Sequence, residues 1–174
     1  MPVSLLLVVP SGKHSIYSQS KAAPQINQVN IFIGAAAVAD YRPSEVSTHK
    51  IKKNAETLTL NFIKNSDILS QVSARKHRPF VVGFAAETEN VLQNAGQKRL
   101  NKKLDMIIAN PVNSTETGFD SNDNCGWILT AESSIELPHM SKAQMAIKIL
   151  EAVANVLMTP LQYFQKSYHN KIEG

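Results

Sequence analysis

Residues 80–88 of the chain read FVVGFAAET, a short apolar run that contains one glycine and ends in small and polar side chains. A continuous apolar run of this length is typical of a strand that is buried on both faces of a sheet. Two further runs have the same character, IFI at residues 31–33 and MIIAN at residues 106–110. Strands buried on both faces are typical of parallel sheets, so these three runs predict an α/β fold.

Helical patterns separate these strands. Apolar side chains recur at helical spacing over residues 89–103, and either Glu87 or Thr88 can cap that helix. Residues 65–67, Asn-Ser-Asp, are typical of a second helix start. Residues 58–63 alternate apolar and polar side chains, which predicts a half-exposed strand. Strands that alternate with helices predict a three-layer, Rossmann-like fold in which helices flank a mainly parallel sheet.

The C-terminal third of the chain adds a hairpin and a helix. Residues 127–130 and 135–137 are apolar segments on either side of a polar turn, which predicts an antiparallel hairpin at one edge of the sheet. Ser141 and Gln144 have the spacing of a capping box. We expect the helix that begins there to end at Pro160, because proline disfavours a helix interior.

The composition of the 174-residue chain limits its class. Hydrophobic residues make up 43% and charged residues 18%, which excludes intrinsic disorder as the overall state. Cys125 is the single cysteine, so an intramolecular disulfide framework and a cysteine-built zinc site are excluded, and a cytoplasmic location is expected. No apolar run approaches the roughly 18 residues that span a bilayer, so we expect no membrane partner.

The charge pattern favours small anionic partners. Eighteen basic against fourteen acidic residues give a net charge of +4. The lysines gather in two compact groups, within residues 50–53 and 98–103, whereas nucleic-acid binders more often spread cations along a face with aromatic residues between them. Aromatic residues make up only 6% of the chain. We therefore expect phosphate-bearing small molecules rather than nucleic acid as partners.

Several candidate site residues follow the predicted strands, where open α/β sheets bind ligands. Gly34, Ala35 and Ala36 let a backbone approach an anion closely, although tight helix–sheet packing is an equal alternative. Asp40 stands where a magnesium or ribose contact would be useful, whereas a loop aspartate is more often a cap or turn residue. Phe84 can stack on a base, but core packing is the commoner role of a strand phenylalanine.

The lysine groups also have two interpretations. Lys50 begins the run KIKK, which is either a mobile flap over a polyphosphate or a solvated charged loop. Lys98 and Lys102 are four residues apart, so they project from one face of the 89–103 helix. Like charges at that spacing destabilise a helix slightly, and an anion bound between them would remove the penalty.

Other kinds of site are excluded by the sequence. It contains no Walker A loop, no Gly-x-Gly-x-x-Gly and no Gly-x-Ser-x-Gly. Its five histidines show no metal-ligand spacing. The expected chemistry therefore depends on the lysines and on the residues that follow the strands.

Taken together and in order, these segments resemble one family. The matching motifs are GAAAVADYRP at 34–43, KIKK at 50–53, KNSDI at 64–68, FVVGFAAET at 80–88, QKR at 97–99 and GFDSNDN at 118–124. The series closely resembles phosphopantothenate–cysteine ligase, also called phosphopantothenoylcysteine synthetase. In many bacteria that enzyme is the C-terminal half of a bifunctional coenzyme A biosynthesis protein. The resemblance covers roughly three-quarters of the chain.

The resemblance implies a reaction, its co-substrates and an assembly. The bacterial enzyme uses CTP and magnesium to activate the carboxylate of 4′-phosphopantothenate as an acyl-cytidylate, and the amine of cysteine then displaces CMP to form an amide. Its relatives are homodimers. The CTP contacts of the family fall on Gly34, Ala35, Ala36, Asp40, Lys50, Ser66, Asp67, Ile68, Leu69, Phe84, Lys98 and Lys102. Lys50 is the expected catalytic cation, and Asp40 is the expected magnesium ligand.

The chain also departs from the family pattern. Nothing in residues 1–30 matches the Gly-Gly-Thr loop or the Asn-x-x-Ser-Gly segment of the family, and Ser66 stands where the family usually has proline. We therefore expect a divergent segment over residues 1–30, an incomplete ligase-like CTP-binding domain over 31–158 and a tail over 159–174. The alternative function is that of a truncated, catalytically incomplete module for nucleotide binding or dimerisation.

Overall fold

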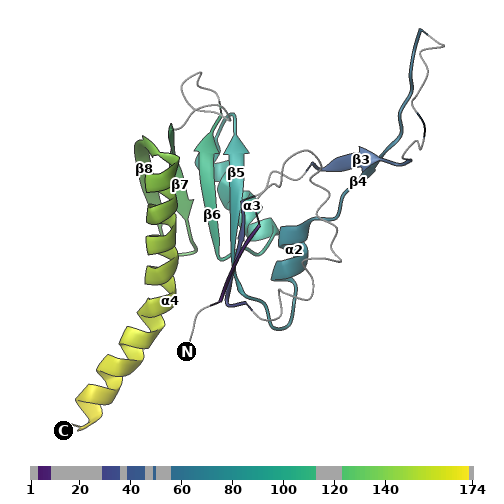
Figure 1. Ribbon diagram of the computed structural model, residues 1–174. Coiled ribbons are helices and arrows are strands. Elements are labelled where there is room, and N and C mark those ends of the chain that lie inside the picture. The colour runs from purple at the N-terminus through teal and green to yellow at the C-terminus, as the bar shows by residue number, and fades with distance from the viewer. Residues whose placement is uncertain are drawn as a thin grey trace.

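The computed structural model describes residues 4–8, 29–35, 39–45, 49, 56–112 and 123–172. Within these ranges the main sheet has six strands in the order β1-β2-β5-β6-β7-β8 (Figure 1). Their bounds are Leu5–Val8 (β1), Ile31–Gly34 (β2), Phe80–Glu87 (β5), Met106–Pro111 (β6), Asp123–Leu129 (β7) and Ser134–Ser141 (β8). The first four strands in this order pair in parallel, and β7 pairs antiparallel with both β6 and β8. The expected mainly parallel sheet with an antiparallel hairpin near its C-terminal end is confirmed.

Helices on both faces make the fold three layers thick. α2 (Ile68–Ser73) and α3 (Val91–Asn101) contribute to the core on one face, and α4 (Lys142–Ile172) contributes to the core on the other (Figure 1). The central strands supply side chains to both cores: Val81 belongs to the first and Val82 to the second, and both are fully buried. The continuous apolar runs therefore arise because each central strand is covered on both sides.

Two glycines bring α2 close to the sheet. Gly34 and Gly83 are register partners on β2 and β5, and Leu69 of α2 lies against both positions. A Cβ at Gly34 would lie 2.8 Å from Leu69 Cδ2. A Cβ at Gly83 would lie 3.1 Å from Leu69 Cδ1 and 2.7 Å from Leu104 Cδ1. The missing side chains at these two positions let the first turn of α2 pack directly on β2 and β5.

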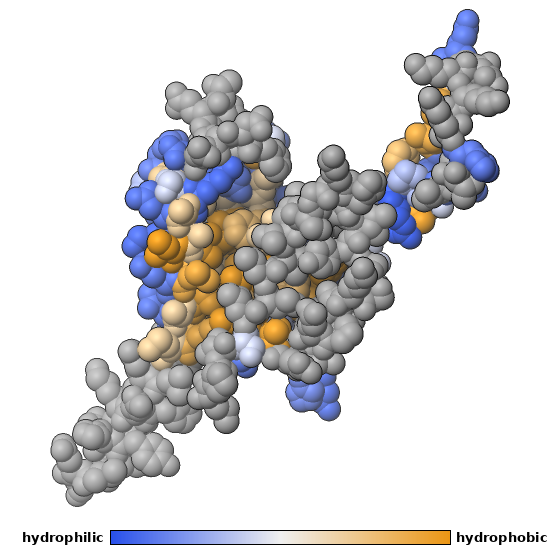
Figure 2. Space-filling model, viewed as in Figure 1, coloured by the Kyte–Doolittle hydropathy of each residue, from blue (hydrophilic) through white to orange (hydrophobic). Residues whose placement is uncertain are grey.

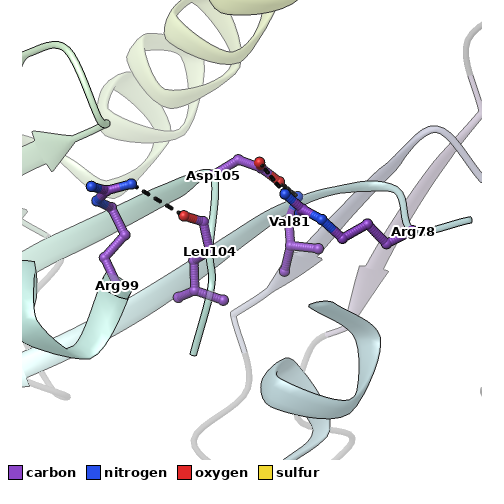
Figure 3. A network of polar contacts seen from close by, with 5 residues as sticks. All are labelled: Arg78, Val81, Arg99, Leu104 and Asp105. Carbon is purple, nitrogen blue, oxygen red and sulfur yellow. Dashed lines mark hydrogen bonds and ion pairs between the residues drawn. The ribbon is translucent and has the colours of Figure 1, made fainter. Parts of the chain in front are cut away.

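Figure 3 shows a polar network where β5 and β6 begin. Arg78 donates from Nη1 and Nη2 to the Asp105 carboxylate at 2.5 and 2.7 Å, and the Val81 N–H donates to it at 2.8 Å. Arg99 of α3 donates to the carbonyl oxygen of Leu104 at 3.3 Å. The hydrogen bonds to Asp105 raise the pKa of Arg78, because they favour the charged form of the guanidinium. The network fixes the amino ends of the two strands relative to each other.

α3 is shorter than the predicted helix, and its cap differs. The N-cap is Asn90, which lies in the left-handed region at φ 46° and makes no side-chain cap hydrogen bond. The prediction that Glu87 or Thr88 caps this helix is therefore wrong. Glu87 stays in β5 because it pairs with Pro111 of β6 and its carbonyl oxygen accepts a hydrogen bond from the Val112 N–H at 3.0 Å.

α4 begins as predicted and ends elsewhere. The Gln144 N–H donates to Ser141 Oγ at 3.2 Å and the Ser141 N–H donates to Gln144 Oε1 at 3.1 Å, so the capping box is confirmed. The helix continues through Pro160 to Ile172, and the predicted end at Pro160 is wrong. A proline removes one helical hydrogen bond without having to end the helix, and the residues after it include the strong helix formers Leu, Gln and Lys. No described helix is both long and apolar enough to cross a membrane.

β3 (Tyr41–Pro43) and β4 (Phe62–Lys64) form a separate antiparallel sheet that projects from the main body (Figure 1). We call β3, β4 and the adjoining residues 56–61 the arm. The predicted strand over residues 58–63 is wrong in its bounds, because only its last two residues belong to β4. Both of these residues are also exposed, Phe62 at 55% and Ile63 at 41%. The alternating sequence pattern of residues 58–63 therefore does not mark one buried and one solvated face of the strand.

Gly126→Ala is expected to lower the free energy of unfolding by about 1–3 kcal/mol, the usual cost of overpacking. A Cβ at Gly126 would overlap the carbonyl oxygen of Ala109 on the paired strand β6, and this backbone atom cannot move without disturbing the sheet. Gly96 in α3 is the control, because nothing lies within 4 Å of its Cβ position. Gly96→Ala is expected to raise the free energy of unfolding by roughly 0.5–1 kcal/mol. Urea denaturation measures both, and equal effects of the two substitutions would contradict this packing.

Candidate functional site

The start of α2 meets the carboxyl end of β2, and this junction forms the floor of the candidate site. Leu69 in the first turn of α2 lies against Gly34, the last residue of β2. Asp67 is the N-cap of α2, and its Oδ1 accepts a hydrogen bond from the Ser70 N–H at 3.1 Å. The helix start predicted from residues 65–67 is therefore confirmed. Of the predicted site residues, Gly34 and Leu69 lie against each other at the junction, and Ala35, Ser66, Asp67 and Ile68 adjoin them in the chain.

Asn65 ties the loop after β2 to the same junction. Its N–H donates to the carbonyl oxygen of Asp40 at 2.7 Å, and its Nδ2 donates to the carbonyl oxygen of Ala39 at 2.6 Å. Arg42 Nη1 in turn donates to Asn65 Oδ1 at 2.9 Å. These bonds hold the backbone of Asp40 beside the residues that precede α2. The sequence pattern indicates Asn65 only as part of a helix start, so its role across the loop escapes prediction.

Lys98 and Lys102 each pair with a carboxylate on a different element. Lys98 Nζ lies 2.7 Å from Glu87 Oε1 at the end of β5. Lys102 Nζ, just after α3, lies 3.0 Å from Asp67 Oδ2 at the start of α2. Two carboxylates of the chain itself therefore offset the repulsion between the two lysines. The four groups also link α3 to β5 and α2, next to the floor of the site.

Asp67 is held in its ionised form at this junction. Its partial burial by itself raises the pKa of Asp67, but the hydrogen bonds from Ser70 and the nearby Lys102 ammonium outweigh that effect. The pKa of Asp67 is consequently below its usual value. At neutral pH the carboxylate can therefore cap α2 and pair with Lys102 at the same time.

Glu87 lies at the candidate site, whereas the sequence pattern predicts for it only the role of a helix cap. Its side chain lies on the face of β5 that carries Gly83 and Ala85, since residues two apart in a strand point the same way. It is only 7% exposed, and Glu87 and Ser73 are the two buried polar residues in the described ranges. The available signal was an acidic residue at a position where the strand pattern predicts burial.

Phe84 faces the other side of the sheet from Lys98 and its partner. Phe84 shares its face of β5 with Val82, which belongs to the core under α4. Its side chain is 37% exposed, so the core interpretation of this phenylalanine is wrong. Since β2 ends at Gly34, the register partner of Gly83, Phe84 lies one residue beyond the end of β2. A ligand in contact with both Phe84 and Lys98 would have to extend across this rim of the sheet.

Two predicted residues, Ala36 and Lys50, lie outside the described residues, as do residues 51–53. Within the described ranges, no three His, Cys, Asp or Glu side chains are grouped so that they could hold a metal ion. Asp40 belongs to the described residues and is exposed. Magnesium commonly binds through one or two carboxylates together with substrate phosphates, and Asp40 fits that mode better than an all-protein site.

Asp67→Asn and Asp67→Ala are expected to separate the two roles of Asp67. Asparagine caps a helix as well as aspartate does but carries no charge for Lys102, so Asp67→Asn should cost only a few tenths of a kcal/mol, the scale of a half-exposed ion pair. Asp67→Ala also loses the cap and should cost about 1 kcal/mol. The measurement is urea denaturation at neutral and acid pH.

The pH dependence of the Asp67→Asn effect has a definite sign. Because the pKa of Asp67 is lowered by folding, its charge stabilises the fold above the unfolded value of about 3.9 and ceases to do so as pH falls through the folded value. The difference between the original chain and Asp67→Asn should therefore shrink as the pH falls below about 4. A difference that is constant across this range would contradict the pairing with Lys102.

Comparison with known proteins identifies the family. The family model described as the DNA/pantothenate metabolism flavoprotein C-terminal domain matches residues 14–157. The chain is 46% identical over 132 residues to the coenzyme A biosynthesis bifunctional protein CoaBC of Escherichia coli K12, a match that covers 74% of this chain and 32% of that protein. The chain thus spans about a third of the length of this relative.

Solved structures agree with this assignment. The crystal structure of the C-terminal domain of CoaBC superposes with a TM-score of 0.65 at 26% identity, covering 88% of this chain and 74% of that one. A Cab2 mutant in complex with phosphopantothenate-cysteine has the same fold, with a TM-score of 0.59 at 18% identity over 81% of this chain and 50% of that one. The chain therefore belongs to the family of the DNA/pantothenate metabolism flavoprotein C-terminal domain and is homologous to the phosphopantothenoylcysteine synthetase part of CoaBC.

Proposed function

We propose that this chain uses CTP to activate the carboxylate of 4′-phosphopantothenate and then joins it to cysteine. The observation that carries the proposal is the junction of α2 with the end of β2, beside which Lys98 and Lys102 lie. Ligands of open α/β sheets bind at this edge, and ammonium groups are common phosphate partners. Homology to the synthetase part of CoaBC supports the choice of substrates.

The reaction has two steps, both of which conserve atoms and charge. In the first, a carboxylate oxygen of 4′-phosphopantothenate attacks the α-phosphorus of CTP, the bond to the β-phosphate breaks, and pyrophosphate leaves. In the second, the cysteine amine attacks the acyl carbon, CMP leaves, and the amine loses a proton to solvent as the amide forms. Negative charge grows on pyrophosphate in the first step, so cations beside the phosphates lower its barrier.

The proposed roles follow from this distribution of charge. Lys50 neutralises the leaving pyrophosphate as the catalytic cation, and Lys98 and Lys102 bind phosphate oxygens. Asp40 provides one carboxylate to magnesium, which enters with the nucleotide as part of the substrate and takes its other ligands from phosphates and water. Phe84 lies beside the base, and Gly34, Ala35, Ala36 and residues 66–69 line the nucleotide.

A second candidate is a module that binds the nucleotide without completing the ligation. Residues 1–30 contain neither the Gly-Gly-Thr loop nor the Asn-x-x-Ser-Gly segment of the ligase family, so a ligase that uses these elements would have to supply them from outside this stretch. A module that activates 4′-phosphopantothenate without completing the ligation would release pyrophosphate and form no amide. The two candidates therefore differ in one measurable product.

Assays of nucleotide binding and turnover test the proposal. We expect calorimetric titration to show CTP bound more tightly than ATP, and a short DNA not bound. Lys98→Ala should raise the Kd for CTP about tenfold, the effect of losing one well-placed charged contact, and Lys50→Ala should lower kcat by about a hundredfold because it removes charge stabilisation in the transition state. The matched control is Lys148→Ala on α4, a lysine paired with Glu151 and away from this edge.

The outcomes separate the candidates. Pyrophosphate and amide formed together support the ligase, and pyrophosphate alone supports the binding module. The nucleotide site is contradicted if Lys98→Ala and Lys148→Ala leave the Kd for CTP equal to that of the original chain.

We further propose that the chain forms a homodimer through the arm. A two-stranded sheet on its own is marginally stable in water. The arm nevertheless exposes large apolar side chains (Figure 2), with Leu58 at 65%, Leu60 at 51% and Phe62 at 55% exposure. A second copy would cover these side chains on both arms, which turns an unfavourable exposed surface into a shared core.

Phe62→Lys is expected to shift the chain from dimer to monomer, because it introduces a charge into the proposed shared core. The measurement is analytical ultracentrifugation over a range of concentrations. Ile135→Lys is the control, since Ile135 is 48% exposed on β8, outside the arm. A chain that sediments as a monomer without substitution, or a dimer that both variants leave intact, would contradict the arm as the interface.

A further inference from the structure

Glu87 is the one buried carboxylate among the described residues, and its burial requires a compensating partner. Only 7% of the residue is exposed, at the end of β5 on the face that carries α3. Removing a carboxylate from water is costly unless a cation or hydrogen bonds compensate. The cation at hand is Lys98, whose Nζ lies 2.7 Å from Glu87 Oε1.

The burial of the two partners is unequal. The Lys98 side chain is 48% exposed, whereas that of Glu87 is 8% exposed, so the carboxylate lies beneath an ammonium group that reaches the surface. The pair is not aligned as a hydrogen bond, and Oε1 has no hydrogen-bond partner among the described residues. A lysine ammonium has three N–H donors. Lys98 therefore keeps donors available for a second anion while it remains beside Glu87.

The neighbouring pair shows what is particular about Glu87. Asp67 also pairs with a lysine, but its carboxylate caps α2 as well and is 37% exposed. Glu87 caps no helix, because the N-cap of α3 is Asn90. Within the described residues, the contact with Lys98 is therefore the interaction that compensates for the burial of a carboxylate at the end of β5.

We infer that Glu87 is a positioning residue that holds the Lys98 ammonium at the rim of the sheet, ready to receive a phosphate group of a nucleotide. The inference rests on the proposed function for the identity of the anion and goes beyond it by assigning a role to Glu87. A lysine side chain has many rotamers, and fixing them before binding reduces the entropy lost when the phosphate arrives. Glu87 raises the affinity for the nucleotide in this way although it is itself an anion.

This role predicts an effect opposite in sign to that of charge alone. Glu87→Gln removes a negative charge beside the proposed site, so charge alone would strengthen the binding of a triphosphate. Loss of positioning weakens it instead, and we expect the Kd for CTP to rise about fivefold to tenfold, within the usual range for coupled neighbours. The effect should persist at high salt, where the difference due to charge is screened.

Matched variants isolate the pair. Glu89→Gln removes the same charge from an exposed side chain two residues further on, and its Kd should equal that of the original chain or fall slightly. Glu87→Gln should add no more than about a twofold change to a chain that already carries Lys98→Ala, because a positioning residue has no effect without its lysine. Glu87→Asp keeps the charge with a shorter reach and should give a Kd between those of the original chain and Glu87→Gln.

The experiment is calorimetric titration of CTP into the full chain and these variants at low and high salt, with a thermal melt of each to establish that it is folded. Should Glu87→Gln not fold, Glu87→Asp and its combination with Lys98→Ala give the same comparison.

If the original chain binds CTP and Lys98→Ala weakens that binding, a Kd for Glu87→Gln that is unchanged or lower overturns the positioning role and leaves the proposed function intact. If the original chain binds no nucleotide, the proposed function fails and the assignment to Glu87 fails with it.

Discussion

The contact of Leu69 with the paired glycines of β2 and β5 determines where the other groups at the carboxyl edge lie. α2 has only six residues, fewer than an isolated helix needs to be stable in water, so its position depends on packing. Gly34 and Gly83 admit that packing because neither has a side chain to hold Leu69 away. Once α2 is placed, its N-cap Asp67 is placed too, and the Lys102 ammonium follows by its 3.0 Å contact.

The balance of charge at this edge explains how the fold tolerates two lysines four residues apart. Lys98 is in the last turn of α3 and Lys102 follows it, where the helix dipole favours cations. Glu87 and Asp67 remove the remaining repulsion. A lysine ammonium has three N–H donors, so a phosphate can bind Lys98 or Lys102 while the carboxylate stays in contact with the same ammonium group.

The parts of the fold that depend on local patterns could be predicted from the sequence, and the parts that depend on distant contacts could not. The runs around Ile33, Val82 and Ile108 predict the buried strands because a strand that is buried on both faces has apolar residues at successive positions. The capping box at Ser141 is equally local. The continuation of α4 past Pro160 is not, since proline only weakens a helix and the outcome depends on the whole segment.

The same distinction applies to the candidate site. The ends of the predicted strands indicate which residues lie at the carboxyl edge of the sheet. The pairing of Gly34 with Gly83 in the register of β2 and β5 agrees with the prediction that Gly34 lies at that edge. The partners of Lys98 and Lys102 depend on how α3 crosses the sheet, which no spacing in the sequence encodes. Phe84 and Gly83 are neighbours in a strand, so the sequence does predict that they face opposite sides of the sheet. The end of β2 beside them cannot be predicted in this way, because it depends on the fold.

The two edges of the sheet use different cations, and the difference follows from what each edge must do. At the amino ends of β5 and β6, the planar guanidinium of Arg78 makes two hydrogen bonds to Asp105, a geometry that leaves little freedom to move. In the described ion pairs of the carboxyl edge the cations are lysines, Lys98 and Lys102, each in contact with one carboxylate oxygen. An ammonium group can rotate and share its donors between that oxygen and a ligand, whereas a guanidinium that left its carboxylate would lose both bonds together. The Arg78–Asp105 pair thus keeps the strands aligned at one edge of the sheet. The lysines at the other edge can therefore share their donors with a ligand without disturbing that alignment.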